Sequence, residues 1–176
     1  MKRTIIKYGL LSGAMAAVLM ISTVLISMKM GLDAGALLGY IMLVISFMVI
    51  WFAMLSYKKS MGGARLSFGT CIKIGLAISV ISSLFYVGAW LIAYYYMIPD
   101  FWGQYAKHAA DIMRRDHKPE SAITAMYAEY MKYKEWYKNP LINAAFTFTE
   151  PFPVGVIVTL ISAGIMQIKS KKKEVK

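Results

Sequence analysis

Four long apolar runs constrain the fold of this chain more than any other feature of its sequence. They cover residues 8–28, 36–57, 74–98 and 144–168. The hydrocarbon core of a bilayer is about 30 Å thick, and a helix needs about 20 predominantly apolar residues to cross it. We therefore predict an all-α membrane protein with four transmembrane helices, in which residues 1–176 form a single polytopic domain.

The composition supports a membrane location. Hydrophobic residues make up 59% of the 176 residues and charged residues only 16%, whereas soluble domains average roughly 45–50% and about 25%. These fractions exclude a soluble enzyme domain. The net charge of +11 would by itself suit nucleic-acid binding, but the charges fall between the apolar runs, so we expect no nucleic-acid partner. The single cysteine, Cys71, excludes an intramolecular disulfide and a paired-cysteine metal or redox site.

The first run reads as a retained helix rather than as a cleaved signal peptide. Lys2, Arg3 and Lys7 resemble the basic start of a signal peptide. However, the charge-free stretch of residues 8–28 has 21 residues, more than the roughly 7–15 of a signal sequence. No convincing cleavage pattern of small residues closes it, so we expect it to stay in the protein.

The distribution of Lys and Arg predicts the orientation. With the N-terminus inside, residues 1–7, 58–73 and 169–176 are inner segments and hold 12 basic residues in 31 positions, with one acid. The outer segments, residues 29–35 and 99–143, hold 8 basic residues in 52 positions, with seven acids. Because basic residues are concentrated in cytoplasmic loops, we predict that both termini are cytoplasmic.

The C-terminus carries a cluster of lysines, namely Lys169, Lys171, Lys172, Lys173 and Lys176. Such a cluster can bind nucleic acid. Beside a membrane helix it can instead bind anionic lipid headgroups, with about 1 kcal/mol gained per basic residue. No aromatic residues that could stack on bases accompany these lysines, so we expect contact with anionic lipid headgroups.

Residues 99–143, between the third and fourth runs, predict a helical hairpin on the outer, periplasmic side. Proline ends one helix and suits the first turn of the next, so Lys118-Pro119 predicts the turn of the hairpin. Each predicted helix has an aromatic-rich apolar stripe opposite a charged face, and Tyr and Trp favour the headgroup level of a membrane. We expect the hairpin to lie across the outer ends of the spans rather than to form a ligand site.

Small residues recur at intervals of four, and in lipid such residues let helices approach closely. They are Gly9, Gly13 and Ala17 in the first run; Gly31, Gly35 and Gly39 leading into the second; Cys71, Gly75, Ser79 and Ser83 in the third; and Gly155, Thr159, Ser162, Ala163 and Gly164 in the fourth. The pattern suits an intramolecular bundle. It would serve a homo-oligomer or another membrane partner equally well.

Glu150 is the one acid within a predicted span. A carboxylate inside the membrane is by default a functional group, for instance in proton-coupled transport. The alternative is structural, because Pro151 suits a first helical position and Thr147 or Thr149 could cap the turn. Glu150 would then lie at the positive end of a helix dipole, at the outer interface. The sequence favours the structural role and leaves the transport role open.

No catalytic, cofactor or metal site is predicted. His108 and Asp111 stand three residues apart, as do His117 and Glu120, and this spacing brings side chains together on a helix. Pro119 interrupts the second pair, and zinc usually requires three or four ligands. The sequence has no Gly-x-Ser-x-Gly, no His-Glu-x-x-His and no phosphate-binding glycine loop, so we expect no enzyme.

Several short strings together resemble a known family. They are Tyr8-Gly9-Leu10, Gly39-Tyr40, Ser56-Tyr57-Lys58, Ser67-Phe68-Gly69, Pro99-Asp100-Phe101, and Glu150-Pro151-Phe152-Pro153-Val154-Gly155 followed by Ser162-Ala163. Over about residues 5–170 the chain resembles the domain-of-unknown-function family 4199, small four-span membrane proteins found mainly in Bacteroidetes-type bacteria. The resemblance implies a location in the bacterial cytoplasmic membrane, and it implies no activity.

Two function classes follow from the sequence. We favour a non-enzymatic accessory or scaffold protein of the inner membrane, whose outer hairpin meets a partner protein or the lipid surface. The alternative is a small oligomeric transporter or channel that uses Glu150. A transporter requires polar side chains facing a cavity within the bundle. A scaffold requires a dry bundle with an exposed apolar or aromatic patch on the hairpin.

Overall fold

The computed structural model describes the backbone of residues 1–30 and 32–174, and the side chains of residues 1–27 and 37–168. Within that part of the chain every regular element is a helix. In chain order these are α1 (Lys2–Met30), α2 (Leu32–Phe47), α3 (Val49–Ser60), α4 (Phe68–Ile92), the π-helix η1 (Ala93–Met97), α5 (Phe101–Arg115), α6 (Glu120–Trp136), α7 (Pro140–Phe148) and α8 (Pro151–Glu174).

Among the described residues, four helical segments are long and apolar enough to cross a membrane: Lys2–Ser27, Leu37–Ser60, Phe68–Met97 and Pro140–Ile168. The second combines α2 with α3, the third α4 with η1, and the fourth α7 with α8. The prediction of an all-α protein with four spans is confirmed. The fourth span starts four residues earlier than the predicted residue 144, because α7 extends it.

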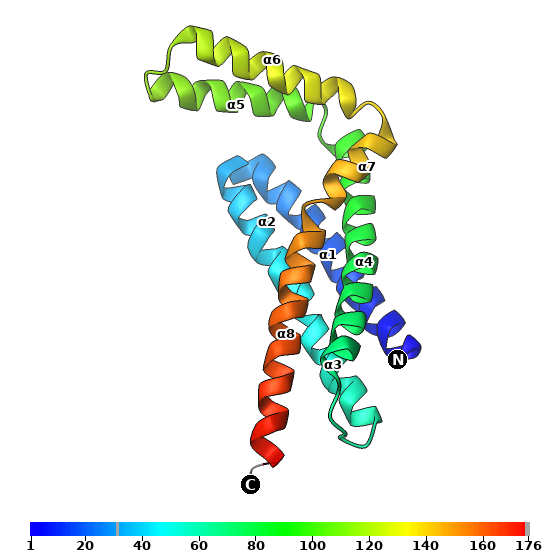
Figure 1. Ribbon diagram of the computed structural model, residues 1–176. Coiled ribbons are helices and arrows are strands. Elements are labelled where there is room, and N and C mark those ends of the chain that lie inside the picture. Colours follow the sequence, from blue (N-terminus) through cyan, green and yellow to red (C-terminus); the bar gives the residue numbers. More distant parts are fainter. Residues whose placement is uncertain (31, 175–176) are drawn as a thin grey trace.

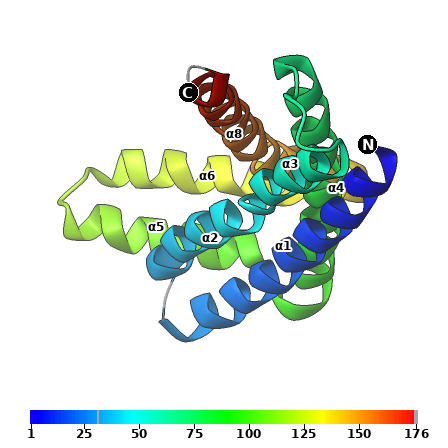
Figure 2. The ribbon, with the colours of Figure 1, turned by 90° about the horizontal axis from the view of Figure 1, so that it is seen from below.

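The spans form a bundle with the hairpin across one end. Figure 1 shows α1, α2, α3, α4 and α8 gathered together, while α5 and α6 lie across the top and α7 leads back into α8. Both chain ends lie toward the opposite end of the bundle (Figure 1). Seen along the bundle, α5 and α6 extend to one side, past α2 (Figure 2). We call these two ends of the bundle the hairpin end and the terminal end.

The turn of the hairpin lies where the sequence predicts it. α5 ends at Arg115 and α6 begins at Glu120, with Pro119 as the extended residue just before α6. His117 supplies the sharp reversal, because its backbone is in the left-handed region with φ of 55°. The predicted break at Lys118-Pro119 is therefore confirmed.

The half of the bundle toward the terminal end is filled by apolar side chains. Its buried members are Leu43, Phe47, Ile50, Ala53, Met54, Leu66, Cys71, Ile74, Ile78, Ala163 and Met166. Gln167 joins α8 to the loop before α4, since its side-chain amide donates to the Leu66 carbonyl at 2.9 Å. Lipid is as apolar as these side chains, so close packing rather than exclusion from water stabilises this half.

The small residues of the third and fourth spans bring α4 and α8 into close contact. A Cβ atom added to Gly155 would lie 2.6 Å from Ser79 Oγ, and one added to Gly75 would overlap Thr159. Gly9 meets α4 in the same way, 2.8 Å from Ile81 Cδ1. The predicted use of small residues for packing within the chain is confirmed at these contacts, while Gly31 and Gly35 and the C-terminal lysine side chains lie outside the described residues.

The second span breaks at Met48, which no glycine or proline in the sequence predicts. Ser12 of α1 donates its hydroxyl proton to the Ser46 carbonyl at 2.8 Å. A side chain that bonds to a helix carbonyl weakens the regular ladder and favours a kink. The next turn tightens accordingly, because Trp51 N–H bonds to the Met48 carbonyl at 3.1 Å, three residues back. The span thus consists of two helices joined at Met48.

Candidate binding cavity

The fourth span is broken at Glu150. α7 ends at Phe148 and α8 begins at Pro151, which confirms Pro151 as a first helical residue. Proline suits this position because it has no N–H group to leave unsatisfied and its φ is already helical. On the other side of the break, Asn139 caps α7 by accepting a hydrogen bond from Leu141 N–H at 2.9 Å.

Glu150 lies inside the fourth candidate span and not at its first residue. It is the eleventh residue of the 29-residue span Pro140–Ile168, because α7 lies between it and the hairpin. The expected caps also differ. The Thr147 and Thr149 hydroxyls donate to Asn143 Oδ1 at 3.1 Å and to the Phe146 carbonyl at 2.6 Å, both within α7. Glu150 therefore lies within the half of the span toward the hairpin end, and not at its tip.

The carboxylate of Glu150 is held by the third span. Tyr86 donates its phenolic proton to Glu150 Oε2 at 3.2 Å. Tyr86 stands eleven residues before Met97, the last residue of its span, so the two partners lie at matching depths. This bond joins the middle of α4 to the break in the fourth span.

A cavity of about 520 Å³ opens in front of Glu150. One wall is mostly apolar and comes from α1 and α2, and the other carries Glu150 and the aromatic side chains of α4 and α5. A second hollow of about 280 Å³ continues beneath the hairpin. Both hollows are lined by Met20, Tyr86, Trp90, Phe101, Tyr105 and Glu150. Glu150 is accessible to solvent through this space although it belongs to a span.

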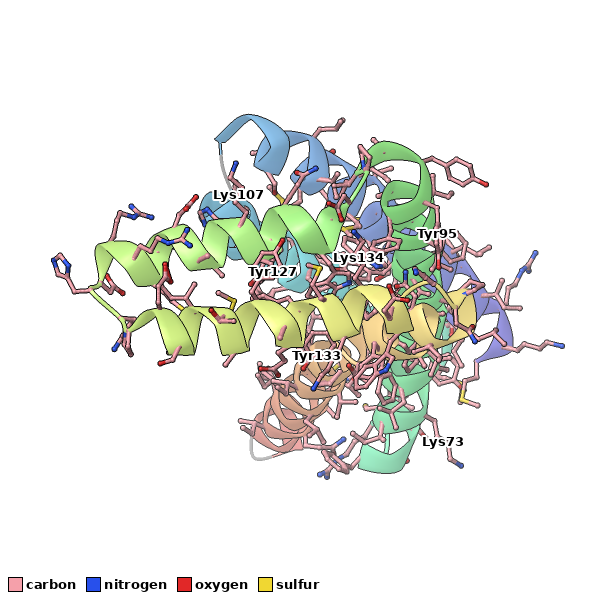
Figure 3. The ribbon with its side chains drawn as sticks, turned by 90° about the horizontal axis from the view of Figure 1, so that it is seen from above. Lys73, Tyr95, Lys107, Tyr127, Tyr133 and Lys134 are labelled. Carbon is pink, nitrogen blue, oxygen red and sulfur yellow. The ribbon has the colours of Figure 1, made fainter. Side chains whose placement is uncertain are left out.

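Aromatic rings of the hairpin form the roof of the cavity. Trp102 of α5 stacks on Tyr130 and Tyr133 of α6, with ring centroids 5.9 Å and 5.2 Å apart. Phe101 meets Trp90 of α4 edge to face, at 5.0 Å. Figure 3 shows α5 and α6 side by side over the bundle, with Tyr133 on α6. The aromatic stripes predicted from the sequence thus face each other and α4.

An ion pair ties the start of α5 to the end of α6. Lys134 Nζ, on α6 (Figure 3), lies 2.7 Å from Asp100 Oδ1. Asp100 also caps α5 by accepting from Gly103 N–H at 3.3 Å, with its own backbone in the left-handed region. The hydrogen bond from Lys134 holds the pKa of the Asp100 carboxyl below its ordinary value. Both contacts fix the roof in place at the level where η1 ends.

A buried amide supports the same wall from α7. Asn143 is fully buried, and its Oδ1 accepts from Trp90 Nε1 at 2.9 Å and from the Thr147 hydroxyl at 3.1 Å. The hydrogen bond to Asn143 therefore orients the Trp90 side chain, whose ring lines the cavity.

The histidines and acids considered for a metal site are not brought together. Arg114 pairs with Asp111 at 3.6 Å and with Glu120 at 3.3 Å. Among the described side chains there is no group of three or more His, Cys, Asp or Glu that could hold a metal ion. His108 instead lines the cavity, where α5 approaches α1 and α2.

Glu150 is the cavity residue that the sequence singled out as a functional candidate. Tyr86 and Trp90 were missed, although their spacing of four places them on one face of a helix. That spacing is a usable signal. Nothing in the sequence pairs them with Glu150 or Asn143, which lie more than 50 positions away.

One comparison with known proteins gave a match. A family model with the description "Protein of unknown function (DUF4199)" matches residues 7–167. No curated protein and no solved structure matches the chain.

Proposed function

This chain belongs to the family of proteins of unknown function DUF4199, and we propose that it is a small non-enzymatic transporter in which Glu150 binds a proton or another cation. The observation that carries the proposal is the position of Glu150 at a helix break, facing a cavity of about 520 Å³. Ionisable groups inside spans commonly mark transport pathways. Broken spans commonly form substrate and ion sites in transporters.

One further feature supports transport over the accessory or scaffold role. A scaffold requires a dry bundle, whereas here the half toward the hairpin end is hollow. A scaffold also requires an exposed aromatic patch, and Tyr127, Trp136 and Phe146 are exposed on and beside the hairpin, so the scaffold role stays the alternative. The terminal half is closed by the core around Phe47 and Ile74, so a carrier that opens alternately to each side fits better than an open channel.

We further propose that the hairpin end faces the periplasm and that both termini are cytoplasmic, in a bacterial inner membrane. The support is the excess of Lys and Arg in residues 1–7, 58–73 and 169–176, combined with a bundle in which both chain ends lie away from the hairpin. Besides the lipid bilayer, the proposed contacts are anionic headgroups at the C-terminal lysines and further copies of the chain. Nucleic acid is not among the proposed partners.

The orientation can be tested with single cysteines in a Cys71→Ser background. A membrane-impermeant maleimide should label Lys118→Cys in intact cells, because the hairpin turn would face the periplasm. It should label Lys2→Cys only after the cells are permeabilised. The reverse pattern would place the hairpin and its cavity on the cytoplasmic side.

The role of Glu150 can be tested by ion flux in proteoliposomes. Under an imposed membrane potential, uptake of H⁺ or Na⁺ should occur with the native protein and fall about tenfold or more with Glu150→Gln. This variant removes the one carboxylate among the described side chains that line the cavity. Glutamine still accepts a hydrogen bond from Tyr86, so the fold should persist.

Glu129→Gln is the matched control, because Glu129 is an exposed acid of α6 and does not line the cavity. This variant should transport like the native protein. Absence of flux for both ions with the native protein, or equal flux with Glu150→Gln, would contradict the proposed function.

A further inference from the structure

We propose that the cavity binds a monovalent organic cation with apolar substituents, such as an amphiphilic amine or a quaternary ammonium or phosphonium ion. Its charged centre would lie between the Glu150 carboxylate and the aromatic rings on α4 and α5. The inference rests on the proposed function, because it takes Glu150 as the group that meets the transported species.

The charge of the cavity selects a cation. Glu150 is the only carboxylate among the described side chains that line the two hollows, and no Lys or Arg lines either of them. An anion would therefore meet the like charge of Glu150, and His108 is the one described lining side chain that could oppose that charge. A small metal ion is a poor match as well, since it prefers several oxygen ligands, while most of this lining is apolar or aromatic.

The aromatic rings provide the rest of the binding site for a cation. Tyr86, Trp90, Phe101 and Tyr105 line both hollows together with Glu150. Trp90 and Phe101 meet edge to face, with 86° between their planes, so the contact between them covers a face of only one of the two rings. Positive charge is attracted to the faces of Trp, Tyr and Phe rings, and cages of such rings recognise quaternary ammonium groups.

The size and the opposite wall select apolar substituents. The main hollow of about 520 Å³ lies within the range of roughly 300–1,000 Å³ that is typical of small-molecule sites. The wall facing Glu150 comes from α1 and includes Ala16, Leu19, Met20 and Val24. Alkyl or aryl groups on the cation would pack against these side chains, since Thr23 and Ser27 are the only polar residues that α1 contributes to the described lining.

The test uses the full-length protein in lipid nanodiscs, with tetraphenylphosphonium as the probe and isothermal titration calorimetry as the measurement. Relative to protein-free nanodiscs of the same lipid, tetraphenylphosphonium should show additional saturable binding, and tetraphenylborate, an anion of the same shape, should not. Glu150→Gln should weaken binding about tenfold or more, because the cation loses its one charge partner in the described lining. Tyr105→Leu should weaken it severalfold, whereas Tyr105→Phe, which keeps the ring, should bind nearly as well.

Two controls separate the site from general effects. Tyr96→Leu removes an aromatic side chain that is 85% exposed and lines neither hollow, and Glu129→Gln removes a carboxylate elsewhere. Both should bind like the native protein.

Equal binding of tetraphenylborate, or unchanged binding by Glu150→Gln and Tyr105→Leu, would overturn the inference. If the phosphonium fails to bind while Glu150-dependent ion flux persists, this inference falls and the proposed function stands. If the phosphonium binds but the native protein gives no ion flux, the proposed transport function is contradicted and the proposed cation-binding site is supported.

Discussion

Gly155→Leu is expected to disrupt the packing of the four spans. A Cβ atom at this position would lie 2.6 Å from Ser79 Oγ, 2.7 Å from Ser79 Cβ and 3.0 Å from Phe47 Cε1. Neither neighbour has room to move, because Ser79 and Phe47 are both fully buried. Ser79 is also held by its hydrogen bond to the Gly75 carbonyl at 2.9 Å. Leucine would therefore force α8 away from α4.

We expect Gly155→Leu to lower the free energy of unfolding by about 3 kcal/mol, at the upper end for an overpacked site. The measurement is unfolding of the purified protein in mixed detergent micelles, followed by tryptophan fluorescence. Gly164→Leu is the matched control in the same helix, since a Cβ atom at Gly164 has nothing within 4 Å. Equal losses in the two variants would mean that helix contact at Gly155 is not what stabilises the bundle.

Asn143→Leu is expected to destabilise the wall of the cavity. Leucine offers no acceptor, so Trp90 N–H and the Thr147 hydroxyl would both lose the oxygen that they share. A buried donor left unsatisfied costs about 1–3 kcal/mol. Part of that loss is offset because Thr147 can bond to a carbonyl of its own helix. We expect a loss of about 2 kcal/mol in the same unfolding measurement.

A double-mutant cycle with Trp90→Phe isolates the bond itself. Phenylalanine keeps a ring against the cavity and removes the donor, so Asn143→Leu should cost measurably less in this background. Fully additive losses would show that the two side chains do not stabilise each other. The cycle also bears on binding, since Trp90 is one of the rings that line both hollows.

The spans and the hairpin follow from local sequence, because apolar length and proline position act within a few residues of each other. The breaks within the spans are predictable only in part. Pro151 predicts the start of α8, but no local pattern predicts that the fourth span continues outward to Pro140. The polar Asn143 looks like the end of an apolar run. Its amide is tolerated inside the span because Trp90, far away in the sequence, donates to it.

The same limit applies to the second span and to the cavity. The break at Met48 coincides with a hydroxyl from another helix, that of Ser12, which bonds to the Ser46 carbonyl. Glu150 could be singled out as an unusual carboxylate, but its depth depends on α7, and its partner Tyr86 comes from a different span. These features depend on contacts between residues that are far apart in the sequence. Local patterns in a single sequence do not indicate which distant residues meet.

The two breaks, at Met48 and at Glu150, have a mechanical consequence. Phe47, next to the first break, would contact a Cβ atom at Gly155, close to the second, so the two breaks lie at similar depth. At each of them the helical ladder is interrupted, and a change in backbone angles there can alter the tilt of α2 or α7. A tilt of α2 would also move Leu43 and Phe47, which belong to the core around Ile50 and Ile74. We therefore expect motion at the break at Met48 to be opposed by this core, and motion at the break at Glu150 to displace α7 more freely.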